Sequence, residues 1–389
     1  MFFPSLLPSP KALSFLAAIG LGIFSAPVAL ATGDLPSFTS TTQAATCGEC
    51  HQAQFEQWAT GSNTDLMEVP LHEGGEAKGS LHSLALQNDH FYSHFENQGD
   101  QIMCLRCHLP ESIYTTEPVH GVVAPHPRRQ HDENGLEGVT CVSCHLDTEG
   151  QIRGPHSYDP IEGVEDHAVL ADSGTFDGVG VCASCHGDPF FGALTDTVRE
   201  WERQSTFDET CVDCHMSGMD GDEKANHTFI GGHSPTLVTR ALDVYIDVDR
   251  IENSKHLWYT LRNDAAGHLL PTGDLFRAYQ ITVEVYEDHQ PDGLPVRSLE
   301  RWLAGRFVTP ISWEVDTYER LDPLAPGEQH TFGLPVEGLE TGAYRVETTV
   351  TWWLLKPTKM RVVGRDDDVI EPGVGDTVLW QDVRGFSIL

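Results

Sequence analysis

The sequence predicts an α+β protein with two unlike parts. The first is a domain of short helices and loops over residues 32–235, and the second is an antiparallel β-sandwich-like domain over residues 236–389. All ten cysteines lie between residues 47 and 214, where Gly, Pro and Asp are scattered and helical patterns are brief. After Pro235 the chain has no cysteine and contains several β-branched and aromatic segments of alternating polarity, which are typical of strands.

Residues 1–31 have the pattern of a secretory signal peptide. Lys11 precedes an apolar run over residues 12–30, and Ala29-Leu30-Ala31 fits a cleavage site. Glycines and a proline interrupt the run and no charged flank stops it, so a retained membrane anchor is less favoured. We therefore expect cleavage near Ala31, no stable membrane span afterwards, and an exported protein, periplasmic in a bacterium.

One five-residue motif, C-x-x-C-H, occurs five times. It is the attachment motif of c-type haem: two thiols bond the vinyl groups of the porphyrin, and the following histidine binds the iron. The sequence thus predicts five covalently attached haem c groups. The attachment cysteines are Cys47, Cys50, Cys104, Cys107, Cys141, Cys144, Cys182, Cys185, Cys211 and Cys214, and the iron ligands are His51, His108, His145, His186 and His215.

Zinc ligation and a disulfide framework are the alternative interpretations of ten paired cysteines. Neither requires a histidine after every pair, so haem is favoured. The five motifs begin at residues 47, 104, 141, 182 and 211, a spacing too uneven for a repeat of fixed period. It is also too short for each haem to have its own apolar core. We expect the haems to fill the interior, with loops and short helices, including 52–59 and 195–204, around them.

Fifteen further histidines could supply second axial ligands, which closely packed electron-carrying haems commonly have. His227 and His233 are favoured because Gly231-Gly232 lets the backbone approach a porphyrin closely. His82 lies where a helix could present it. Neighbouring methionines are expected to pack rather than bind iron. The candidate second ligands are His82, His120, His126, His156, His227, His233 and His268, whereas His72 and His167 have no predicted role.

The predicted strands of the second domain number roughly seven. The clearest segments are 244–249, 257–261, 279–286, 344–352 and 377–380, with turn residues between several of them. This domain could act as a lid or docking module, or it could only shield haem edges from water.

The chain is strongly acidic, with 58 Asp and Glu against 24 Lys and Arg and a formal net charge of −34. This charge disfavours nucleic acid and anionic membrane surfaces as partners. It favours redox partner proteins with a basic docking surface, although an acidic coat can also serve solubility alone.

Three segments of the first domain resemble a known family. They are Cys47–His51 followed by Trp58, Glu137–His145, and Thr210–Met216 followed by His227 and Gly231-Gly232-His233. They are similar to multihaem cytochromes of the cytochrome c-554 and hydroxylamine oxidoreductase type. The resemblance implies that His233 serves as a haem ligand.

Two functions remain open, and an electron carrier without catalytic residues is favoured over an enzyme. The alternative is a multihaem oxidoreductase of nitrite, hydroxylamine or sulfur compounds, which needs one iron with an open position. All five motifs have the same form, and none marks a special haem. A filament-forming or structural cytochrome is a third possibility, because β domains can mediate assembly.

Overall fold

The structure is a computed structural model, and it describes part of the chain. The described residues are 42–62, 65–70, 75–85, 107–108, 137–147, 149–160, 167–176, 178–187, 196–204, 207–217, 225–249, 251, 255–273, 276–290, 293–305, 312–315, 317–363, 368–371 and 373–389. The predicted signal peptide, Cys104, His120 and His126 lie outside these residues. In the part of the chain that is described, no helix has the length and apolar character needed to cross a membrane.

Short helices form the first part of the molecule. They are α1 (Ala44–Gly48), α2 (Gln52–Thr60), α7 (Cys141–His145), α8 (Ser173–Phe176), α9 (Gly180–His186), α10 (Thr197–Gln204) and α11 (Cys211–His215). The predicted helices at 52–59 and 195–204 are confirmed as α2 and α10. The third, fourth and fifth motifs each lie on a helix that ends at the motif histidine.

Side chains at the third helical position fix the start of two motif helices. The Thr140 amide donates to Ser143 Oγ (2.8 Å), and the Thr210 amide donates to Asp213 Oδ2 (2.7 Å). Such bonds satisfy backbone groups that a helix start leaves without an intrahelical partner. Each therefore holds the first turn that carries the two cysteines.

Two small sheets and one more helix complete this part. Strands β1 (Val69–Pro70) and β2 (Glu76–Ala77) pair antiparallel, and β3 (Arg153–Gly154) and β4 (Leu170–Ala171) pair parallel. Helix α12 (Pro235–Ala241) begins with Ser234, whose Oγ accepts from the Leu237 amide (3.3 Å). Serine followed by proline is a helix-start signal that the sequence analysis missed.

The second part is built of strands. They are β5 (Leu242–Asp247), β6 (His256–Asn263), β7 (Ala278–Glu287), β8 (Arg297–Ala304), β9 (Ser312–Val315), β10 (Arg320–Leu321), β11 (Gln329–Pro335), β12 (Gly342–Leu355), β13 (Thr358–Val362), β14 (Val369–Glu371) and β15 (Val374–Ile388). A five-stranded sheet has the order β10-β8-β7-β12-β15, and two three-stranded sheets have the orders β11-β6-β5 and β14-β13-β9. The five predicted segments fall largely on β5, β6, β7, β12 and β15.

The predicted number of strands is wrong, because the described part of this region alone has eleven strands. Strand β8 has the sequence Arg-Ser-Leu-Glu-Arg-Trp-Leu-Ala. Its charged residues obscure the alternation of polar and apolar positions by which a strand is recognised. Strands β8 and β10 also pair parallel, whereas the prediction was antiparallel throughout. All other strand pairs in this region are antiparallel.

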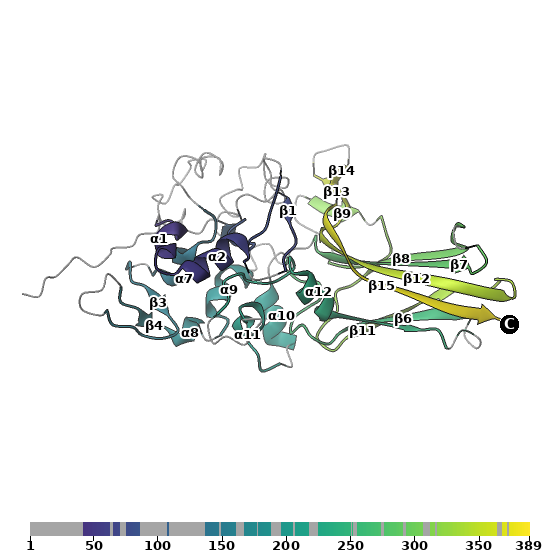
Figure 1. The fold of residues 1–389 in the computed structure, drawn as a ribbon, viewed down its shortest axis with the longest axis horizontal. Helices are drawn as coiled ribbons and strands as arrows, with labels where there is room; N and C mark the ends of the chain where they lie inside the picture. The colour runs from purple at the N-terminus through teal and green to yellow at the C-terminus, as the bar shows by residue number, and fades with distance from the viewer. Residues whose placement is uncertain are drawn as a thin grey trace, which may run out of the picture.

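One apolar core joins the five-stranded sheet to the β11-β6-β5 sheet, which gives a two-layer arrangement (Figure 1). Leu257 and Leu261 of β6 and Ile281 and Val283 of β7 are fully buried in it. The hydroxyl groups of Tyr259 and Thr348 connect the two layers at 3.2 Å.

The first part contributes little to this apolar core. The described residues that it adds are Met67, Val69, Leu84 and, from α12, Val238, with Ala77, Leu81 and Ala241 packed against the cluster. Its helices cluster at one end of the molecule and the long strands extend to the other, with α12 between them (Figure 1).

Candidate haem sites

The motif histidines lie in pairs with histidines from distant parts of the chain. The ring centroids are 5.9 Å apart for His51 and His167, 6.2 Å for His186 and His82, 6.3 Å for His145 and His227, and 6.2 Å for His215 and His268. Each pair joins one motif histidine to one histidine outside the motifs. The four separations fall within a narrow range, although each pair brings together different segments of the chain.

This separation suits a metal ion held between two imidazoles. A bond from a metal to an imidazole nitrogen is about 2.0 Å long, so two such bonds in line span about 4 Å. Roughly one more ångström on each side, from nitrogen to ring centre, gives about 6 Å. The residues present therefore fit an iron with two axial histidines at each pair.

Backbone carbonyls fix the protonation of most of these rings. A ring Nδ1 lies beside a carbonyl oxygen in His108 (Ala85, 3.0 Å), His145 (Arg153, 2.8 Å), His167 (Ala168, 3.2 Å), His215 (Ile230, 2.5 Å), His227 (Ala225, 2.9 Å) and His268 (Leu269, 2.8 Å). A carbonyl oxygen can only accept, so Nδ1 carries the proton and the Nε2 lone pair is free to bind iron.

Burial keeps the imidazoles of His82, His227 and His268 neutral, the form that binds a metal. Burial, with smaller effects of His186 and His108, lowers the pKa of His82 to about 3. Burial likewise lowers the pKa of His227 and of His268 to about 4. All three are therefore uncharged at neutral pH.

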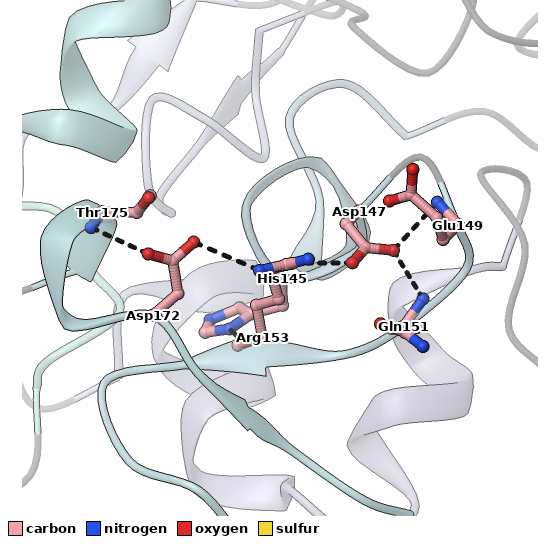
Figure 2. Close-up of polar contacts among 7 residues, drawn as sticks. All are labelled: His145, Asp147, Glu149, Gln151, Arg153, Asp172 and Thr175. Carbon is pink, nitrogen blue, oxygen red and sulfur yellow. Dashed lines mark hydrogen bonds and ion pairs between the residues drawn. The ribbon is translucent and has the colours of Figure 1, made fainter.

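An ion-pair network orders the backbone around the third motif (Figure 2). Asp147 Oδ1 accepts from the amides of Glu149 (3.0 Å) and Gln151 (2.8 Å), and its Oδ2 accepts from Arg153 Nε (2.7 Å). Arg153 also lies 3.7 Å from Asp172. The carbonyl that orients His145 belongs to Arg153, so the network positions a motif histidine.

A single loop, residues 225–233, connects several of the sites. The His227 amide donates to Gln57 Oε1 on α2 (3.0 Å), and the Ile230 carbonyl orients His215. Trp352 Nε1 of β12 donates to the Gly232 carbonyl (2.6 Å), which ties the loop to the β region. This segment, defined here as the 225–233 loop, therefore contacts the surroundings of the first, third and fifth motifs.

Cysteine contacts show which motifs are neighbours. The neighbouring Cys141 thiol lowers the pKa of Cys47, and the Cys47 thiol in turn raises that of Cys141. The Cys182 and Cys211 thiols form the same kind of pair, which lowers the pKa of Cys211. The first motif thus adjoins the third, and the fourth adjoins the fifth.

Of the predicted second ligands, His82, His227 and His268 lie opposite motif histidines. His82 lies in a turn rather than in a helix. Gly138, at a φ of +90°, allows that turn to approach, because a Cβ there would lie 3.0 Å from the His82 carbonyl oxygen. His167 has no predicted role, because no local motif marks it.

Two predicted ligands lie elsewhere. His156 is exposed. His233 has no exposed surface, and neither ring nitrogen has a hydrogen-bond partner among the described residues. Burial and the nearby Arg277 guanidinium lower its pKa to about 3. No described motif histidine pairs with the His233 ring.

Comparison with known proteins agrees with this geometry. The family model for cytochrome c554 and c-prime matches residues 46–146. The fold is similar to the crystal structure of a penta-haem cytochrome c552 from Thermochromatium tepidum, with a TM-score of 0.56 and 17% sequence identity. That match covers 89% of this chain and 99% of the other, and no curated protein matches the chain.

The attachment motifs, the paired histidines and the family match over residues 46–146 agree with one another. The low identity to the cytochrome c552 makes that likeness one of fold alone. Residues 46–146 resemble the cytochrome c554 family, and the five attachment motifs and the paired histidines fit a multihaem c-type cytochrome.

Proposed function

We propose that the protein is an exported cytochrome that carries electrons through five covalently attached haems. The observation that supports this most directly is the succession of histidine pairs. The first motif lies beside the third, because Cys47 interacts with Cys141. The fourth motif lies beside the fifth, because Cys182 interacts with Cys211. His108 of the second motif lies near enough to His82 to lower its pKa. Phe229, which contacts both His227 and His82, lies between these two groups of motifs.

A bound haem would supply a one-electron redox couple. The chain would determine the reduction potential of that couple through axial ligands, hydrogen bonds and burial. In this proposal His167, His227, His82 and His268 are the second ligands of the first, third, fourth and fifth motifs. The carbonyls beside Nδ1 would hold the rings of His167, His227 and His268 in the tautomer that binds a metal through Nε2. Burial lowers the pKa of His82 to about 3 and so keeps its imidazole neutral.

The second motif is oriented like the others, because Nδ1 of His108 lies 3.0 Å from the Ala85 carbonyl oxygen. His120 and His126 remain predicted second ligands. The oxidoreductase alternative requires one iron with an open coordination position.

The acidic charge of −34 supports a partner with a basic docking surface. In that case the association rate with a basic redox protein should fall steeply as salt increases. The signal-peptide pattern of residues 1–31 supports export to the periplasm.

Haem content and spin state test the proposal. A pyridine haemochrome assay on the purified protein should give five haems per chain. Electron paramagnetic resonance (EPR) of the oxidised protein should show low-spin haems with two axial histidines. A high-spin signal that shifts on adding nitrite or hydroxylamine would instead support the enzyme, and a count well below five would contradict the proposal.

The His167→Ala variant tests the ligand that the sequence did not indicate. Removing this ring should leave the first-motif iron without a second imidazole, so one low-spin signal should give way to a high-spin one. His156→Ala is the matched control, because His156 is an exposed histidine of the same region. If both variants retain the wild-type EPR spectrum, His167 is not a ligand.

A further inference from the structure

Phe229 lies in the 225–233 loop between two of the histidine pairs. Its ring centroid is 4.5 Å from that of His82 and 5.8 Å from that of His227, and it meets both rings nearly edge-on, at 82° and 79°. His82 belongs to the fourth-motif pair and His227 to the third-motif pair. One aromatic side chain thus contacts the second ligands of two sites.

The backbone at Phe229 adopts an unusual conformation. Its φ is +52°, in the left-handed region that bulky residues avoid. The preceding turn is held by the Thr228 amide, which donates to Asn226 Oδ1 (2.8 Å), and by the Asn226 amide, which donates to the Met216 carbonyl (2.6 Å). A glycine would be the easier residue at this position, so the presence of phenylalanine indicates that its ring is needed.

His82 differs from the other three second ligands in how its ring is held. Nδ1 of His167, His227 and His268 each lies beside a backbone carbonyl. Among the described residues, no hydrogen bond to a ring nitrogen of His82 is present. The Phe229 ring, in close edge-on contact, is positioned to restrict rotation of the His82 imidazole.

The geometry points to Phe229 as a positioning residue: it sets the orientation of the His82 imidazole and, more weakly, that of His227, and so links the electronic states of the fourth-motif and third-motif sites. This inference rests on the proposed ligand assignment. Groups that orient an axial ligand tune the metal it binds. The effect should be larger at His82, because the Ala225 carbonyl also holds His227.

EPR and potentiometric titration of the holoprotein carrying Phe229→Leu test the inference. The low-spin signal of the fourth-motif site should shift or broaden, that of the third-motif site should change less, and the midpoint potentials of the same two haems should move. His82→Ala and His227→Ala identify the two signals, since each should convert one of them to high spin. If these two variants convert no signal, the ligand assignment itself is wrong.

Three further variants separate positioning from folding. Phe229→Tyr keeps the ring and should give a near wild-type spectrum, whereas Phe229→Gly relieves the backbone and should still give the altered one. Phe176→Leu is the matched control, because Phe176 stacks on His145 of the third motif (5.0 Å, 18°) and should alter that site alone. Unchanged spectra and potentials in both Phe229→Leu and Phe229→Gly, or equal changes at every haem, would overturn the inference.

Discussion

Without its haems, the protein is expected to keep the β region folded and to lose the helical part. The apolar core consists mainly of residues from the strands, such as Tyr259 and Ile281, whereas the helical part adds only a few described residues to it. Domains are stable by only about 5–15 kcal/mol, so a part that loses the groups filling its interior should not remain folded.

Limited proteolysis of haem-free protein measures this. A mature chain produced without haem attachment should yield a resistant fragment that begins near Pro235 and contains β5 to β15. The holoprotein, treated in parallel, should resist cleavage over most of its length. Equal protection of residues 42–217 with and without haem would show that side-chain packing, and not porphyrin, stabilises that part.

The second large effect concerns a buried ion pair in the β region. Lys356 and Glu314 both have fully buried side chains, with Lys356 Nζ 3.2 Å from Glu314 Oε2 and 2.7 Å from the Gly305 carbonyl. Thr358 Oγ1 and the Tyr318 hydroxyl also donate to Glu314. Lys356→Met leaves a buried carboxylate without its cation, which costs about 3–5 kcal/mol.

Thermal unfolding of the holoprotein checks this cost. Lys359→Met is the matched control, since Lys359 forms a partly exposed pair with Asp368, which Arg361 also contacts. Losing such a pair should cost at most about 1 kcal/mol. Combining Lys356→Met with Glu314→Leu should recover most of the stability. If Lys356→Met is no worse than Lys359→Met, the buried pair does not contribute as argued.

The parts of the site that depend on local chemistry could be predicted from the sequence. Haem attachment needs two thiols and a histidine within one turn. The motifs that end at His145 and His215 can therefore be recognised from five consecutive residues. The C-terminal strands were predictable for a similar reason. Strand β12 buries every second residue, and its sequence shows the same alternation.

The second ligands depend on contacts between distant residues, and local sequence could not fix them. His227 was favoured because of its glycine-rich surroundings and lies opposite His145, whereas the buried ring nitrogens of His233 in the same stretch have no hydrogen-bond partner among the described residues. His167 follows Glu165-Asp166 in the sequence, and its ring lies 5.9 Å from that of His51, 116 residues away in the chain. Only the folded chain brings these two rings together.

The proposed iron–histidine bonds also interlace the chain. The proposed histidine pairs overlap along the chain. His82 lies between His51 and its partner His167, and His145 lies between His82 and its partner His186. In the same way, His215 lies between His145 and its partner His227, and pairs with His268 further on. Each bond closes a loop of roughly 50 to 120 residues, and a permanent cross-link of that size removes about 4 kcal/mol of unfolded-state entropy. Because successive loops overlap, no stretch of the chain from the first motif to β6 can unfold before an iron–histidine bond breaks. The rate at which the axial histidines dissociate should therefore limit the rate at which this protein unfolds.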